Sequence, residues 1–161
     1  MKKLNALGIG PKIGIVAIPY LIVTILLNIY YKDLFYVGKI LDFPLFVFGI
    51  ILLIIGVIFY IITVRLLLKG LKTTTLMTTG TYYLCQNPLY TAIILMIIPG
   101  LSFVLHSWLI LTTSIVAFVL FKTQIKSEYK ELETFFGGSY EAYRKDTPEF
   151  LPFPFKKWLA K

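Results

Sequence analysis

The stretch Thr79-Gly80-Thr81-Tyr82-Tyr83-Leu84-Cys85-Gln86-Asn87-Pro88-Leu89-Tyr90 is polar and aromatic, and it lies between two of the most apolar segments of the chain. The Asn87-Pro88 step predicts a helix start, because the missing N–H of a proline costs no hydrogen bond in the first helical turn. Asn87 is the predicted N-cap, with its side-chain oxygen accepting a hydrogen bond from an early amide. We therefore expect a loop at a membrane surface that leads into a helix with Tyr90 just inside it. Free N–H groups, an amide and several phenols at such a place could hold a small polar ligand.

The composition predicts an all-α integral membrane protein. Hydrophobic residues make up 58% of the chain, charged residues 15%, and the mean hydropathy is +0.82, whereas about 25% of residues are charged in an average soluble domain. The 161 residues allow four or five spans at about 20 residues each, which predicts a single membrane domain over residues 1–161. One cysteine, Cys85, and one histidine argue against a disulfide and against a metal site. The net charge of +8 forms no basic patch on a soluble face, so we expect no nucleic-acid partner.

Long runs without charge predict four transmembrane helices. The apolar block from Pro88 to Phe121 is too long for one span and divides at His106-Ser107. Its halves measure about 25 and 21 Å as helices, which is short against a hydrocarbon core of about 30 Å. This predicts a short helical hairpin, bent in its first arm at Pro99-Gly100. The expected spans are residues 13–31, 43–64, 89–105 and 108–121.

The chain becomes amphipathic after Lys122. Charges of both signs accompany apolar residues at helical spacing, which predicts two C-terminal cytoplasmic helices, at about 124–136 and 139–146. Gly137-Gly138 separates them, Ser139 is the predicted cap of the second, and Pro148 stops it. The tail from Phe150 onward combines aromatic residues with lysines, which suits the membrane interface.

The distribution of lysine and arginine predicts the topology. The leader before the first span holds three of the sixteen, the expected loop from Arg65 to Gln86 holds three, and the segment from Lys122 onward holds eight. The loop at 32–42 holds the other two. Because lysine and arginine concentrate on the cytoplasmic side, both termini and the middle loop are predicted there. The polar stretch at 79–90 and the amphipathic tail would then meet at one membrane face.

Two motifs carry a resemblance to a known family. The first is Gly80-x-Tyr82-x4-Asn87-Pro88-x-Tyr90, and the second is Glu128-x3-Leu132-x3-Phe136-Gly137-x2-Tyr140-x2-Tyr143-x4-Pro148-x3-Pro152. In this order around a hydrophobic hairpin they resemble the isoprenylcysteine carboxyl methyltransferase and phospholipid methyltransferase family of integral membrane enzymes. The resemblance covers roughly the second half of the chain, and the first two spans add only hydrophobicity.

The resemblance implies an enzyme that binds S-adenosylmethionine between the Asn-Pro helix start and the C-terminal helices. The acceptor would be lipophilic or embedded in the bilayer. Tyr90 and Glu128 would be catalytic. The cofactor-binding residues would be Tyr82, Asn87, Pro88, Tyr90 and Glu128. The residues that would bind the acceptor are Tyr140, Tyr143 and Arg144.

The sequence departs from the family pattern at several positions. Thr81 replaces Pro, Tyr83 and Gln86 replace Arg, and Asp146 stands where prenylcysteine enzymes have Arg. A carboxylate-bearing acceptor would be repelled by Asp146, so we expect a neutral or amine-bearing lipophilic acceptor.

The chemistry expected of such residues is compatible with methyl transfer without requiring it. Displacement at a sulfonium needs orientation more than acid or base groups. An amine acceptor would also have to lose a proton, which Glu128 or a phenol could take.

Three other interpretations stay open. Tyr82 and Tyr90 could be interfacial anchors, with Glu128 a solvated helix charge. The chain could be a membrane reductase of the steroid-reductase type using NADPH, which extra basic residues for the 2′-phosphate would favour. It could also be a non-enzymatic membrane scaffold or a transporter, although uncharged spans argue against ion transport.

Overall fold

The computed structural model describes residues 8–37 and 41–152, and within them the only element that is not helical is an isolated bridge between Tyr36 and Ser107. Three helices are long and apolar enough to cross a membrane: α1 (Gly10–Tyr30), α3 (Asp42–Thr73) and α7 (Trp108–Phe136). A shorter apolar rod consists of α5 (Pro88–Thr91), the π-helical segment η1 (Ala92–Ile97) and α6 (Ile98–Val104). The remaining helices are α2 (Lys32–Phe35), α4 (Thr81–Leu84) and α8 (Gly138–Asp146). The predicted all-helical membrane fold is confirmed at this level.

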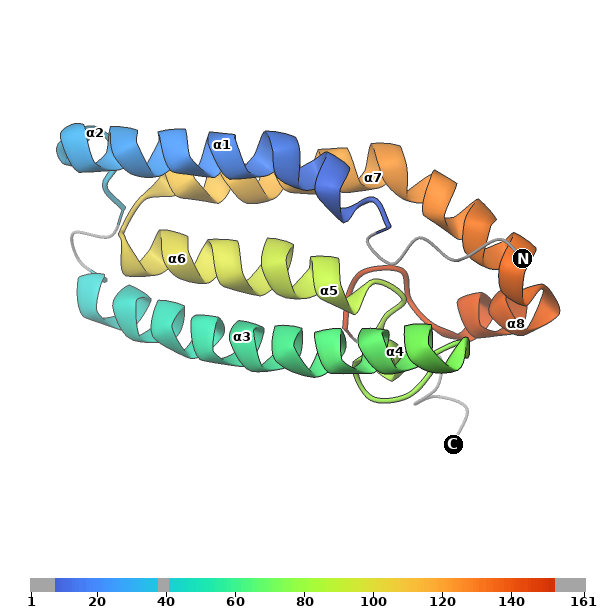
Figure 1. The fold of residues 1–161 in the computed structure, drawn as a ribbon. Coiled ribbons are helices and arrows are strands. Elements are labelled where there is room, and N and C mark those ends of the chain that lie inside the picture. Colours follow the sequence, from blue (N-terminus) through green and yellow to red (C-terminus); the bar gives the residue numbers. More distant parts are fainter. Residues whose placement is uncertain (1–7, 38–40, 153–161) are drawn as a thin grey trace.

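The long elements pack side by side as an up-and-down bundle (Figure 1). α1 packs on α7, α7 packs on α6, and α6 packs on α3. α4, the start of α5 and α8 lie at one end of the bundle, and α2 lies at the other end. The end with α4 and α8 is hereafter called the α8 end. It gathers the polar segments that the sequence separates.

A row of small residues brings α3 close to the central rod. Its buried members recur every seven residues, which is about two helical turns. They are Gly49, Gly56, Thr63 and Gly70. A Cβ atom added at Gly49 would lie 2.9 Å from the carbonyl oxygen of Gly100. These small residues therefore allow close contact between the helices, while the other faces of α3 expose isoleucine and phenylalanine side chains in the manner of a lipid-facing helix.

Hydroxyl groups connect α1 to α7 within the apolar region. Tyr20 Oη and Thr112 Oγ1 are 3.0 Å apart, and Thr24 Oγ1 and Thr113 Oγ1 are 3.4 Å apart. Such contacts satisfy polar groups that lipid could not.

The second predicted span is too short. α3 continues from Asp42 through Arg65, Lys69 and Lys72 to Thr73, so the expected loop beginning at Arg65 is wrong. The helix continues past its first charge because lysine and arginine are good helix formers. The helix ends where Thr74 adopts a left-handed conformation, with φ of 52°.

The helices predicted at 108–121 and 124–136 are one helix, α7. Composition changes at Lys122, but no glycine or proline interrupts the backbone there. The hairpin turn at His106-Ser107 is confirmed, with φ of 50° at His106. Its first arm is the rod from Pro88 to Val104, and its second arm is much longer than expected.

The first arm contains a wider helical turn than an α-helix. In η1, Ile98 N–H bonds the carbonyl of Ile93, five residues back. This turn lies directly before Pro99, which has no N–H to direct at Leu95.

Two predicted caps are wrong in detail. Asn87 does precede the helix start at Pro88, but its side chain makes no capping hydrogen bond. Ser139 lies inside α8, whose N-cap position is Gly137, and its hydroxyl bonds the carbonyl of Phe136. The leader up to residue 7 and the interfacial tail from residue 153 lie outside the described residues.

Candidate functional site

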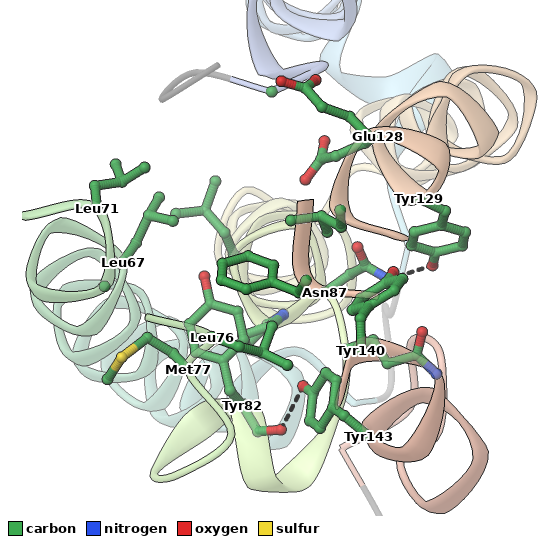
Figure 2. A pocket seen from close by; sticks show the side chains of 18 of the residues that line it. Leu67, Leu71, Leu76, Met77, Tyr82, Asn87, Glu128, Tyr129, Tyr140 and Tyr143 are labelled. Carbon is green, nitrogen blue, oxygen red and sulfur yellow. Dashed lines mark hydrogen bonds between the residues drawn. The ribbon is translucent and has the colours of Figure 1, made fainter. Parts of the chain in front are cut away.

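A pocket opens at the α8 end of the bundle between α3, the start of α5 and the last turns of α7 (Figure 2). The empty space between its walls is about 1020 Å³, which includes the open mouth. Leu67 and Leu71 of α3 form one side, and Glu128 of α7 lies across the pocket from them. Two elements distant in the sequence thus build one cavity.

Asn87 holds the α5 start against the C-terminal end of the described chain. Its side-chain nitrogen donates to Tyr129 Oη over 2.5 Å and to the carbonyl oxygen of Glu149 over 2.9 Å. Both amide hydrogens are therefore used by the protein itself. These two bonds set the orientation of the side chain, whose oxygen accepts no capping hydrogen bond. Asn87 lines the pocket, and its side-chain nitrogen holds the neighbouring walls in place.

Residues 147–150, the C-terminal segment, are fastened to the same helix start. Gln86 N–H donates to the carbonyl of Pro148 over 2.9 Å, and Thr91 Oγ1 donates to that of Phe150 over 2.7 Å. The ring of Phe150 is buried beside Phe121, with centroids 5.1 Å apart. Buried hydrogen bonds and aromatic contacts together fix one side of the pocket.

Glu128 reaches across to the two residues that immediately precede α1. Its Oε2 atom accepts hydrogen bonds from Ile9 N–H at 3.1 Å and from Tyr90 Oη at 3.3 Å. Gly8 lies directly against this carboxylate, since an added Cβ would be 2.5 Å from Oε2, and its φ is +50°. A side chain at position 8 would thus be strained and would displace the carboxylate.

Three tyrosines form the floor of the pocket (Figure 2). Tyr143 Oη donates to the carbonyl of Tyr82 over 2.7 Å, which joins α8 to α4. Burial raises the pKa of the Tyr82 and Tyr143 phenols above their ordinary range. Burial also raises the pKa of Tyr140 to about 12, against the opposing effect of the Arg144 charge. These phenols are neutral near pH 7 and can serve as donors or acceptors.

Two buried polar atoms of pocket-lining residues lack a hydrogen-bond partner. They are Tyr140 Oη and Gln86 Oε1. Leaving such groups unpaired costs about 1–3 kcal/mol each. A ligand with its own donors and acceptors would satisfy them.

The charge of the pocket wall is one-sided. Among the described residues that line the pocket, Glu128 and Glu131 are carboxylates, and there is no lysine or arginine. Carboxylates and tyrosine rings favour a cationic ligand. A ligand with several phosphates would meet repulsion.

S-adenosylmethionine fits this set of groups. Carboxylates can hold its ammonium group or its ribose hydroxyls, tyrosine faces suit its adenine and sulfonium, and the two unpaired atoms suit the edge of the base. NADPH fits less well, because its 2′-phosphate has no cationic partner among the described lining residues.

Most residues assigned from the sequence come together here. The pocket is lined by Tyr82, Asn87, Pro88, Tyr90, Glu128, Tyr140 and Tyr143. Arg144 does not line it, and its guanidinium lies 4.8 Å from the ring centroid of Tyr129. Asp146 is an exposed residue outside the lining, so the predicted repulsion between Asp146 and an acceptor carboxylate is wrong. The carboxylates that line the pocket are those of Glu128 and Glu131.

The apolar half of the pocket and the hydroxyl of Tyr129 were not predicted from the sequence. Tyr129 was not among the predicted site residues, although its hydroxyl bonds both Asn87 and Glu149. The sequence signal that could have identified Tyr129 is its place directly after Glu128. The missed apolar lining residues include Leu67, Leu71, Leu76, Met77, Leu132 and Phe136.

No family model matches the chain, and no match was found among curated proteins or solved structures.

Proposed function

We propose that this protein is an S-adenosylmethionine-dependent methyltransferase that acts on a lipophilic acceptor at the membrane. One observation carries the proposal: the pocket combines two carboxylates, a tyrosine floor and no described cationic lining residue. This supports a cationic cofactor. The cofactor would supply an electrophilic methyl group, and the protein would contribute mainly orientation.

Glu128 and Tyr90 are the proposed catalytic pair. Their 3.3 Å contact and the hydrogen bond from Ile9 N–H fix the carboxylate at the pocket wall. An amine acceptor would lose its proton to Glu128, while Tyr90 would orient the carboxylate. Tyr140 and Tyr143, on the opposite side, would bind the acceptor or the adenine. Arg144 would act only through its contact with Tyr129.

The acceptor is proposed to be neutral or amine-bearing. Its apolar part would lie along Leu67, Leu71 and Met77, which form the apolar side of the pocket. A carboxylate on the acceptor would meet Glu128 and Glu131 without a compensating described cation.

The proposal includes four membrane crossings, with the rod from Pro88 to Val104 as the third, and a cytoplasmic α8 end. The rod is shorter than the three long helices. Its support is its position between α3 and α7, both of which are long enough to span.

Calorimetry of the detergent-solubilised protein tests the cofactor. We expect micromolar binding of S-adenosylhomocysteine and none of NADPH. Glu128→Gln removes the charge at the pocket wall and should weaken binding by about 1–3 kcal/mol, whereas Glu133→Gln, at an exposed position on the same helix, is the matched control.

Asn87→Ala should weaken binding by a similar amount, because it releases Tyr129 and the C-terminal segment. Binding of NADPH alone would favour the reductase. Binding of neither compound to the folded protein would favour the scaffold.

A further inference from the structure

A second hollow lies between the start of α1 and α7, on a different face of α7 from the candidate active site. It encloses about 620 Å³, counting its open mouth. It is called the lysine groove here, and its lining residues are Lys12, Thr123, Gln124, Lys126, Ser127 and Lys130. The α7 residues among them, except Gln124, follow the i, i+3, i+4, i+7 spacing that places side chains on one helix face.

The groove concentrates positive charge without a compensating acid. Three of its six lining residues are lysines, and none is a carboxylate. In residues 8–37 and 41–152, the neighbouring Lys122 pairs with Glu149, whereas Lys12, Lys126 and Lys130 form no salt bridge. Three ammonium groups beside two hydroxyls and an amide are suited to a phosphate group.

The groove lies at the boundary of the apolar part of the bundle. Lys12 is in the first turns of α1, which then continues without charge to Tyr30. Lys122 is the first charged residue of α7, so Lys126 and Lys130 follow one and two turns beyond the apolar region. Lysines at this depth can extend toward a headgroup layer.

Exposed apolar side chains continue from the groove along both helices. Ile15 and Val16 are 75% and 46% exposed and lie three and four residues after Lys12. Val119 and Ile115, 53% and 63% exposed, lie seven and eleven residues before Lys126 on the same face of α7. Such a surface can pack against acyl chains, whereas a free inorganic anion would make no contact with it.

We propose that the lysine groove binds the phosphate of one anionic phospholipid, with the lipid chains along the exposed apolar faces of α1 and α7. The site is separate from the methyltransferase pocket, because none of its lysines lines that pocket.

Native mass spectrometry of the detergent-solubilised protein tests this with phosphatidylglycerol and phosphatidylcholine of identical chains. We expect one retained phosphatidylglycerol at least about tenfold tighter than phosphatidylcholine. The double variant Lys126→Gln/Lys130→Gln should lose at least about tenfold in phosphatidylglycerol affinity, while Lys126→Arg/Lys130→Arg keeps it. The matched control is Lys69→Gln/Lys72→Gln, which removes two exposed lysines of α3 outside the groove and should change nothing.

Three outcomes would overturn the proposal. One is equal affinity for the two lipids, and another is an equal loss in the α3 control. The third is displacement of the lipid by inorganic phosphate at an ionic strength matched with potassium chloride, which would make the ligand a free anion. Binding of S-adenosylhomocysteine by the glutamine variant should be unchanged, so failure here and failure of the methyltransferase proposal are distinguishable.

Discussion

Two buried tyrosines of the pocket differ in what their hydroxyls do. Tyr129 Oη accepts a hydrogen bond from Asn87 at 2.5 Å and donates one to Glu149 Oε1 at 3.2 Å. Tyr140 Oη has no partner. The first hydroxyl therefore holds the protein together, while the second is available to a ligand.

We expect Tyr129→Phe to lower the free energy of unfolding by about 1–3 kcal/mol, because it leaves Asn87 with an unpaired buried donor. Tyr140→Phe should raise the free energy of unfolding by up to about 1–3 kcal/mol, because it removes a buried hydroxyl that has no partner, yet weaken S-adenosylhomocysteine binding. Denaturant unfolding in mild detergent measures the first quantity and calorimetry the second. Equal destabilisation by both variants would contradict the distinction.

Cys85 is predicted to be unreactive in the folded protein. The residue is fully buried, and burial raises the pKa of its thiol to about 11, against a smaller opposing effect of Thr91. Because the thiolate is the nucleophile, alkylation by N-ethylmaleimide at pH 8 should be at least about 100-fold slower than in denatured protein. Ser139→Cys, exposed on α8, provides a fast-reacting control followed by mass spectrometry.

The same burial implies alkaline sensitivity. Because the pKa of the thiol is about 11 in the folded protein and 9.0 in its ordinary state, the contribution of the neutral thiol to stability is complete below about pH 9. It is lost as the pH rises toward 11, since only the unfolded chain then ionises freely. If Cys85 of the folded protein were alkylated rapidly at pH 8, position 85 would not be buried, and both the slow alkylation and the alkaline sensitivity would be contradicted.

At the scale of elements, the contact between α3 and α6 depends on glycine. A Cβ atom at Gly49 would lie 2.9 Å from the carbonyl oxygen of Gly100 and from the nitrogen of Val104, so backbone would have to move. At Gly14 of α1 the nearest atom is the flexible end of Ile18 at 3.6 Å. The same substitution should therefore have opposite effects at the two sites.

We expect Gly49→Ala to destabilise the bundle by about 1–3 kcal/mol through overpacking. Gly14→Ala should be neutral or stabilising by up to about 1 kcal/mol, because alanine favours helix. Unfolding in mild detergent compares the two variants directly. A loss at Gly14 as large as that at Gly49 would mean that helix contact is not the cause.

The sequence predicted apolar helices well because their signal is a sum over many residues. Ends marked by glycine or proline, such as Gly137 and Pro88, were also predictable. Ends inferred from charge were wrong, since Arg65 and Lys122 are both inside helices. A charged side chain can leave the lipid region without ending a helix.

The site was predictable where chemistry and spacing coincide, as for Asn87 and Glu128. The partners of these residues were not. No local pattern shows that Asn87 bonds the carbonyl of Glu149, 62 residues away, or that Glu128 meets the N–H of Ile9, 119 residues away. Such contacts follow from the packing of whole helices, which the sequence specifies only collectively.

At the scale of the molecule, the bundle is electrically asymmetric. α8, the pocket and the lysine groove all belong to the end that carries Lys12, Lys69, Lys126 and Arg144, whereas α2 at the other end holds one lysine and one aspartate. This asymmetry predicts a cytoplasmic α8 end. With Pro88–Val104 as a span, three crossings separate α2 from α8, and this odd number places the two helices on opposite sides of the membrane.

The last prediction uses single reporter cysteines at Asp33 in α2 and Ser139 in α8, both exposed, while buried Cys85 stays silent. In intact cells, a membrane-impermeant maleimide should label Asp33→Cys at once and Ser139→Cys only after permeabilisation. The physical reason is that the lysines and arginines near α8 are held on the cytoplasmic side. The reverse pattern would invert the topology. Labelling of both cysteines from the same side would mean that two helices, rather than three, separate them. That result would contradict the four proposed crossings, because only an odd number of crossings places α2 and α8 on opposite sides of the membrane.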